Sequence, residues 1–191
     1  MEVSKRLINI QRYQKYNMEK LVEGCIKGNP KARREIFRRY RSVLLGICLR
    51  YSRDKSEAED VLLEGFMQIY QKIGSYAGKG SFEGWMKTVM VHAAINYFRK
   101  NQKENFHENI EDYSEIITDE INILNHLDAK EILKLIQSMP QGYRIAFNLF
   151  AIEGYSHKEI AEKLQYTEST SKSQVRKARF WLMKKIDNNF D

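Results

Sequence analysis

Apolar residues recur along most of the chain at intervals of three and four positions, the spacing that puts them on one face of an α-helix. The pattern predicts helices over residues 18–27, 30–51, 56–73, 81–103, 127–139, 140–153, 156–164 and 167–186. Pro30 and Pro140 suit the first turn of a helix, because proline lacks the N–H group that would go unpaired there. We therefore expect an all-α fold.

The last two predicted helices are separated by a very short break. Ser156, with Glu159 three residues later, forms a capping box that satisfies free N–H groups at a helix start. The break at residues 165–167 leaves room for a second helix that begins at once, with Thr167 as its N-cap. Gln165 stands where Gly would ease a left-handed conformation. This spacing predicts a helix-turn-helix.

The outer face of its second helix carries short polar side chains first and cations afterwards. A recognition helix enters the major groove by its N-terminal end, where short donors and acceptors reach base edges, while Lys and Arg further along meet phosphates. The alternative is a solvated basic helix that closes an ordinary bundle. The candidate DNA-contacting residues are Ser169, Thr170, Lys172, Ser173, Gln174, Arg176, Lys177 and Arg179.

Composition narrows the partners and the chemistry. The 191 residues carry a formal net charge of +7, which favours a polyanionic partner, either nucleic acid or a membrane surface. Cys25 and Cys48 lie on apolar faces without ligand partners, so we expect buried, reduced thiols. No nucleophile–base pair, metal set or phosphate loop appears, and we expect no cofactor and no catalysis. No signal peptide or membrane span is present, so we expect a cytoplasmic protein without stable membrane insertion.

One segment differs in kind from the rest. From Glu104 to Glu120 there are seven acidic residues and no Lys or Arg, a composition that cannot easily bury a core. We expect two small helical domains joined by this acidic flexible linker, the second ending in the helix-turn-helix. The predicted organisation is a short helix or mobile arm at 1–17, a domain at 18–103, the linker at 104–126 and a domain at 127–187.

The first predicted domain contains two further features. Asp60 and Glu64 lie one turn apart on the helix over 56–73, and since no third ligand joins them a protein-binding edge is favoured over a metal or acid–base site. The Gly-containing loop over 74–80 leads into a helix that ends in cations, with aromatic residues near by. Aromatic faces beside cations are suited to unstacked bases.

These segments in this order resemble a known family. SEAEDVLLEGFMQIYQKI, then GSFEGWMKTVMVHAAINYFRK, then MPQGYRIAFNLFAIEGYSHKEIAEKL and the following helix are similar to bacterial RNA polymerase sigma factors of the extracytoplasmic-function (ECF) group. The resemblance spans roughly residues 18–186. It implies a transcription initiation factor that binds RNA polymerase core enzyme and directs promoter recognition and melting.

The resemblance assigns roles to residues. It implies that Ser169 to Arg179 read the minus-thirty-five element. The residues at the polymerase core would be Asp60, Leu63, Glu64, Phe66 and Met67. Those at the melted minus-ten element would be Tyr76, Lys79, Ser81, Trp85, Lys87, Asn96, Arg99 and Lys100.

Departures from the family pattern limit what can be transferred. Leu63, His92 and Asn96 stand where Gln, Asn and Asp are common, and Ser171 and Gln174 replace a common Val and Arg. Promoter sequence therefore cannot be carried over. The linker would thread toward the RNA path as an RNA mimic, or act as a solubilising spacer. Regulation by an anti-sigma factor that holds the protein inactive is a hypothesis that the sequence alone does not decide. A helix-turn-helix regulator that binds DNA without polymerase is the alternative function.

Overall fold

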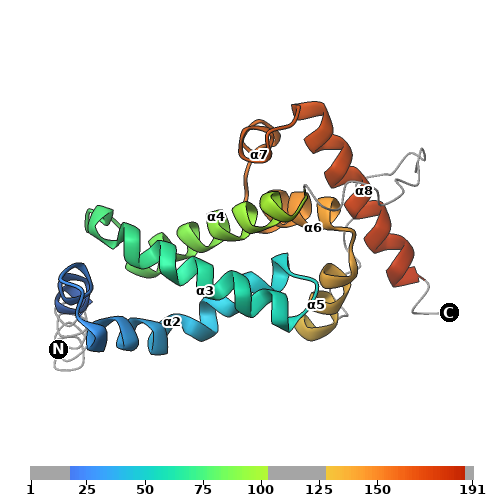
Figure 1. Cartoon of the computed structure of the whole chain (residues 1–191). Helices are drawn as coiled ribbons and strands as arrows, with labels where there is room; N and C mark the ends of the chain where they lie inside the picture. The colour runs from blue at the N-terminus through green and yellow to red at the C-terminus, as the bar shows by residue number, and fades with distance from the viewer. Residues whose placement is uncertain (1–17, 103–127, 188–191) are drawn as a thin grey trace, which may run out of the picture.

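A computed structural model describes residues 18–102 and 128–187, and all regular structure in these two ranges is helical (Figure 1). This confirms the predicted all-α class. The predicted arm at 1–17 and linker at 104–126 lie outside the described residues. Residues 18–26 are helical, and the elements that follow are α2 (Pro30–Tyr51), α3 (Lys55–Lys72), a 3-10 turn (Ile73–Ser75), α4 (Phe82–Gln102), α5 (Ala129–Ser138), α6 (Gln141–Phe147), a π-helical turn (Asn148–Ile152), α7 (His157–Leu164) and α8 (Glu168–Asp187).

The first long helices begin where the sequence supplies caps. Pro30 occupies the first turn of α2, and the Asn29 side chain accepts a hydrogen bond from the Lys31 backbone N–H at 2.9 Å. Asp54 caps α3 by accepting from the Glu57 N–H at 2.9 Å. The start of α3 thus lies one residue before the predicted Ser56, because Asp54 is the better cap.

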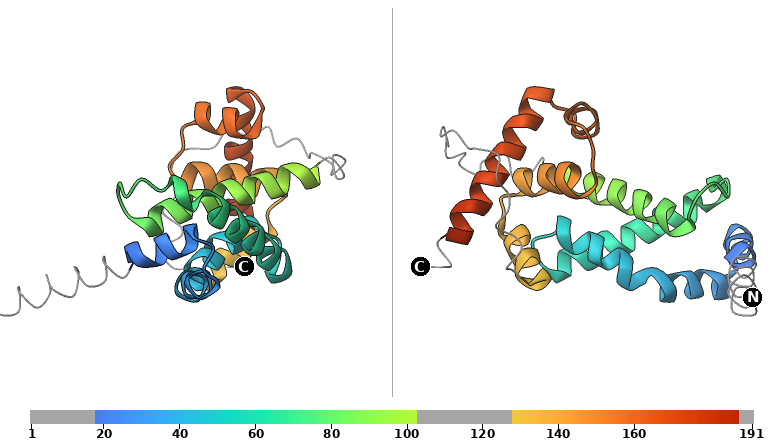
Figure 2. Two further views of the ribbon diagram at one scale, coloured as in Figure 1. Left: turned by 60° about the vertical axis from the view of Figure 1, so that its left-hand side comes forward. Right: turned by 180° about the vertical axis from the view of Figure 1, so that it is seen from behind.

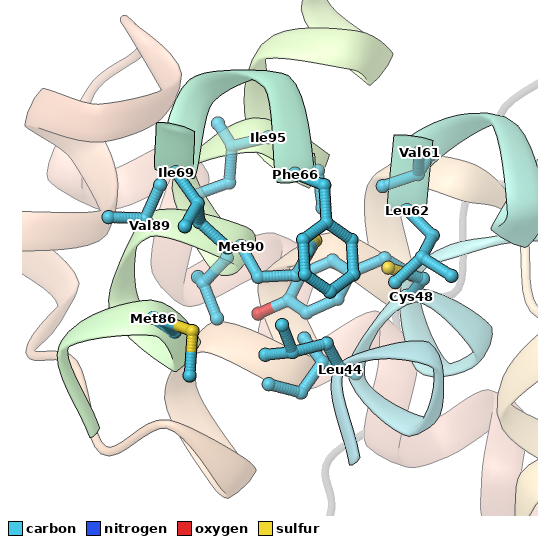
Figure 3. Packing of buried hydrophobic residues seen from close by; sticks show 14 of the residues in the cluster. Leu44, Cys48, Val61, Leu62, Phe66, Ile69, Met86, Val89, Met90 and Ile95 are labelled. Carbon is cyan, nitrogen blue, oxygen red and sulfur yellow. The ribbon is translucent and has the colours of Figure 1, made fainter. Parts of the chain in front are cut away.

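The core of the first half forms between α2, α3 and α4. Figure 3 shows side chains from all three helices pointing into it: Leu44 and Cys48 from α2, Val61, Leu62, Phe66 and Ile69 from α3, and Met86, Val89, Met90 and Ile95 from α4. The apolar residues Ala58, Val61, Leu62, Phe66 and Ile69 of α3, at one- to four-residue spacing along one face, are all buried. At Gly65 a Cβ atom would lie 2.2 Å from the Met90 sulfur, so glycine allows α3 and α4 to approach closely.

Helix α4 is buried on several sides, as expected for a helix at the centre of a bundle. Met86 is fully buried, whereas Trp85 and Tyr97 are half-buried. Cys25 and Cys48 are buried free thiols, as predicted.

The second half consists of α5 to α8. Ile136, Met139, Tyr143, Phe147, Ala178 and Leu182 form a small core of its own. Pro140 precedes α6 as its N-cap rather than lying inside the first turn. From behind (Figure 2), α5 and α6 lie against the end of the bundle, and α8 crosses beside α6.

The two halves are in direct contact. Ile145 and Leu149, from α6 and the π-helical turn, and Ile160 from α7 belong to the same hydrophobic cluster as α2, α3 and α4. The large core therefore continues across the gap between the two described ranges.

Candidate nucleic-acid and polymerase interface

The outer edge of α3 exposes apolar side chains. Leu63 is 57% exposed and Met67 is 63% exposed, one turn apart, and Asp60 lies one turn before Leu63. Soluble helices seldom leave two large apolar residues together in solvent without a partner. Phe66 differs from the other predicted residues of this edge, because it is 3% exposed and packs against Phe37 with ring centroids 4.7 Å apart. It supports the edge from inside instead of forming its surface.

The acidic side of this edge faces a cation of α4. The Glu64 carboxylate lies 3.5 Å from the Lys100 ammonium, and Asn96 and Lys100 are exposed near by. An ion pair at that distance between exposed side chains contributes little to stability. Lys100 thus remains available for other anions.

The loop before α4 is closed by its own hydrogen bonds. The Tyr76 hydroxyl donates to the Gly80 carbonyl at 2.9 Å. Gly78 and Gly80 have φ values of 70° and 76°, a region that glycine enters without strain. Ser81 then caps α4, because its hydroxyl accepts from the Gly84 N–H at 3.3 Å. These hydrogen bonds and glycine conformations give the loop a defined turn structure.

Aromatic rings gather behind this loop. The Phe82 ring stacks on Trp85 at a centroid distance of 5.7 Å, and Tyr76 packs against both rings. Phe82 is buried, while Tyr76 and Trp85 stay half-exposed. Lys79 is exposed at the loop tip. Half-exposed rings beside a cation offer a face on which an unstacked base could lie.

A cleft of about 910 Å³ lies beside the loop. The loop residues Tyr76, Gly78, Gly80 and Ser81 line one side of it, and the helix over 18–26 and α2 line the other. Arg39 and Tyr40 of α2 lie in this cleft, and sequence reasoning missed both. Tyr40 falls in the apolar stripe of α2, four residues after Ile36. Its polar tip was the one signal that this stripe also borders a site.

The structure divides the predicted minus-ten residues into two groups. Tyr76, Lys79, Ser81 and Trp85 lie at the loop end of α4. Asn96, Arg99 and Lys100 lie beyond it along the helix; Asn96 is about 16 Å from Trp85 at 1.5 Å per residue. Lys87 lies between the groups and pairs with Glu83 at 2.7 Å. One extruded base cannot touch both groups.

The helix-turn-helix forms as predicted. The capping box of Ser156 and Glu159 is present at the start of α7. Gln165 ends α7 in the left-handed region, with φ 59° and ψ 44°, and its N–H bonds to the Ala161 carbonyl. Thr167 caps α8 by accepting from the Thr170 N–H at 3.1 Å.

Helix α8 has distinct inner and outer faces. Val175, Ala178, Leu182 and Ile186 are buried, and their three- and four-residue spacing puts them on one face of the helix. Ser169, Lys172 and Arg176 are exposed at three- and four-residue spacing, so they share one outward face. Thr170, Ser173 and Lys177 are half-exposed. This is the face expected for a recognition helix.

Two predicted DNA-contacting residues, Gln174 and Arg179, are half-exposed and make contacts within the second half of the chain. The side-chain oxygen of Gln174 is buried against Gly142 of α6, where a Cβ atom would lie 3.2 Å from it. The Arg179 guanidinium lies over the Phe150 ring, 5.5 Å from the centroid.

A histidine at the start of α7 contacts the inner face of α8. The His157 ring stacks on Phe150 with centroids 4.4 Å apart, and its Nδ1 atom lies 3.0 Å from the hydroxyl oxygen of Ser171. Ser171 is fully buried. Burial and then Lys172 lower the pKa of His157.

The described residues contain no group of three or more His, Cys, Asp or Glu side chains that could hold a metal ion. Within the same residues, no helix has the length and apolarity needed to cross a bilayer.

Comparison with known proteins decides the family. A model of sigma-70 region 2 matches residues 36–104, and a model of sigma-70 region 4 matches residues 129–182. Together the two matches span more than half of the chain. The chain belongs to the sigma-70 family of RNA polymerase sigma factors.

Individual relatives of this sigma factor agree with the assignment. The chain is 27% identical over 177 residues to the ECF RNA polymerase sigma-E factor of Haemophilus influenzae, covering 87% of this chain and 93% of the relative. It is 26% identical over 172 residues to the RNA polymerase sigma-H factor of Pseudomonas aeruginosa, covering 84% and 89%. These relatives confirm the predicted ECF group and a role as an RNA polymerase-binding initiation factor.

Two solved structures are similar to this sigma factor. One is the sigma factor RpoE in complex with the anti-sigma factor NepR from Bartonella quintana, with TM-score 0.47, 20% identity and coverage of 79% of this chain and 94% of that chain. The other is CnrH in complex with the cytosolic domain of CnrY, with TM-score 0.44, 16% identity and coverage of 88% and 96%.

Proposed function

We propose that this sigma factor divides promoter recognition among three surfaces. The edge of α3 binds RNA polymerase core enzyme, the loop before α4 holds a base of the melted minus-ten element, and the outward face of α8 reads the minus-thirty-five element. The factor catalyses no covalent step itself and acts in the cytoplasm, where its polymerase and promoters are found.

The observation that carries the proposal is the edge of α3. The opposite face of that helix packs into the core. Leu63 and Met67 do not contribute to packing within the described residues. Asp60 and Glu64 border the pair with negative charge. An apolar centre with an acidic rim is suited to a partner that presents apolar residues ringed by cations.

The promoter surfaces are supported by their chemistry. Exposed Ser169, Lys172 and Arg176 combine a short hydroxyl group at the start of α8 with cations further along, which fits base contacts followed by phosphate contacts. At the loop, half-exposed Tyr76 and Trp85 lie near the start of α4, and the exposed Lys79 belongs to the loop itself. Because cations meet phosphates, promoter binding should weaken as salt rises.

The test is run-off transcription on genomic DNA of the source bacterium with purified core RNA polymerase, with and without this protein. Discrete start sites that require both components are expected. Sequence-specific binding by the protein alone, without any new transcript, would instead favour a regulator that works without polymerase.

A second measurement tests the recognition helix. Arg176→Ala and Lys177→Ala should each weaken promoter binding by the holoenzyme. Lys27→Ala is the matched control, because it removes the same charge from an exposed ion pair with Glu23 in the first half. Unchanged promoter affinity in both α8 variants would contradict this placement of the recognition helix.

A further inference from the structure

The outer face of the N-terminal half of α2 is strongly cationic. Its cations follow one another at three- and four-residue spacing, so they lie in a row along one side of the helix: Lys31, Arg34, Arg38 and Arg41. We call these four residues the cationic row. All four are exposed, and within residues 18–102 and 128–187 neither Lys31 nor Arg34 forms an ion pair. None of the three surfaces proposed above includes the row.

Two carboxylates lie close to the row, and neither cancels its charge. Glu35 binds two guanidiniums at once, 2.8 Å from Arg38 and 2.6 Å from Arg39. The hydrogen bond from Arg38 and then that from Arg39 lower the pKa of Glu35 to about 2, so the ionised carboxylate holds both arginines in place at neutral pH. Glu59 of α3 lies 3.9 Å from Arg41, which is a long ion pair. The outer face of α2 therefore keeps a net positive charge.

Arg39 connects the cationic row to the cleft beside the loop. It lines that cleft together with Tyr76 of the loop. Its guanidinium shares the Glu35 carboxylate with Arg38, which belongs to the row. Cations therefore lead from the cleft, where a base of the melted strand is proposed to lie, to the outer face of α2.

The chemistry of this face fits a chain of phosphates better than a lipid surface. Helices that bind in a membrane interface carry apolar side chains that enter the acyl boundary. The exposed large apolar side chains among the described residues are Ile26, Val43, Leu63, Met67 and Ile152, and none stands at the three- and four-residue spacing of the row. A face with cations and no apolar anchor binds its partner through charge.

The row also has the length of a short stretch of nucleic acid. Arg41 follows Lys31 by ten positions, so the row is about 15 Å long at roughly 1.5 Å per residue. A stacked strand carries one phosphate per about 3.4 Å, so about four phosphates fit along the row, and fewer where the bases are unstacked.

We infer that the cationic row binds the phosphates of the melted DNA strand whose base lies in the cleft, and that Arg39 guides this strand from the cleft onto α2. The contacts position the strand without reading its sequence, because every nucleotide carries the same phosphate. The inference rests on the proposed function, because it requires a melted strand.

The first measurement locates the strand by cleavage from a tethered iron–EDTA reagent. Ser42→Cys places the reagent at an exposed position next to Arg41, and Lys134→Cys on α5 is the control. Cys25 and Cys48 are buried, so the reagent goes to the introduced thiol. In the open complex with core polymerase, on a promoter found by run-off transcription, Ser42→Cys should cut one strand within the melted segment and Lys134→Cys should not. An open complex without such cuts from Ser42→Cys would overturn the strand path.

The second measurement is the salt dependence with which holoenzyme binds forked promoter DNA that carries the melted strand. Lys31→Gln combined with Arg34→Gln removes two cations of the row. The matched control is Lys130→Gln combined with Lys134→Gln, which removes two exposed cations one turn apart on α5.

Each phosphate contact to a single strand contributes about 0.7 to the slope of log affinity against log salt. The row variant should therefore show a slope less steep by about 1.4, and its loss of affinity should shrink about 25-fold for each tenfold rise in salt. The α5 variant should keep the slope of wild type. An unchanged slope in the row variant, or an equal change in the α5 variant, would count against the phosphate contacts.

Two further outcomes separate the sources of failure. Wild type that binds phosphatidylserine vesicles, with that binding lost in the row variant while its DNA slope is unchanged, would assign the row to a membrane surface instead. Failure of wild type to start transcription with core polymerase would overturn the proposed function, and the strand path with it. Normal transcription together with an unchanged slope in the row variant would overturn the strand path alone.

Discussion

The exposed pair on α3 allows the strongest prediction about polymerase binding. Replacing both Leu63 and Met67 by Ala should weaken the complex with core RNA polymerase without unfolding the protein. Both residues keep more than half of their surface in solvent in the free chain. Burial of that surface in a complex would therefore add to the free energy of binding. Neither belongs to the core.

The magnitude follows from that exposure. Full burial of a Leu or Met side chain contributes about 1.5–3 kcal/mol. Because about 0.6 of each residue is still exposed, the loss is about 1–2 kcal/mol per residue, of which we take the middle, about 2–3 kcal/mol for the pair. At about 1.4 kcal/mol per tenfold, the dissociation constant should rise between about 30-fold and 150-fold.

The assay is an equilibrium titration of fluorescently labelled protein with core polymerase. Val43→Ala is the control, since Val43 is 42% exposed on α2 and outside the proposed surface; it should change the dissociation constant by less than about threefold. Urea unfolding should give the same midpoint for all variants. A folded double variant that binds core polymerase as tightly as Val43→Ala would refute the reasoning.

Three further predictions concern stability and reactivity. Gln165→Gly should raise the free energy of unfolding by about 0.5–1 kcal/mol in urea titrations, because glycine adopts φ 59° without strain; Gln165→Ala should bring no such gain. Burial lowers the pKa of His157 and of His92, so neutral rings favour the folded state and stability should fall as the pH drops from about 7.5 to about 5; a urea midpoint that falls equally in His157→Gln would contradict the role of His157. Burial raises the pKa of the Cys48 thiol to about 12, so iodoacetamide should modify it only after unfolding; fast alkylation of the folded chain would be evidence against this.

Much of the fold was predictable because local patterns agreed with burial. The 3.6-residue period placed the buried face of α3 correctly, and capping residues placed the start of α2, α7 and α8. Gln165 was recognisable in advance as the residue in the left-handed position. In each case the deciding interaction lies within a few residues along the chain.

The inward-facing residues could not be predicted in this way. Arg144 in a helix reads as a solvated cation, because the carbonyl that receives it belongs to a residue 93 positions earlier. Gln174 and Arg179 follow the polar side of α8 in the sequence, yet Gly142 of α6 and the Phe150 ring lie against them. Which polar face meets solvent depends on the position of another helix, and periodicity carries no information about that.

The last carbonyl groups of α2 accept hydrogen bonds from side chains of the second half, namely Gln137, Arg144 and Asn148. This has a consequence for synthesis of the protein. The side chains that satisfy these carbonyls follow 88 to 98 residues later. During translation, which proceeds from the N-terminus, α2 leaves the ribosome before the side chains that bond to its last carbonyls have been synthesised. A nascent chain truncated before Gln137 should therefore keep the core of α2, α3 and α4 but fray at Leu49 to Tyr51, where faster amide exchange would mark the missing partner.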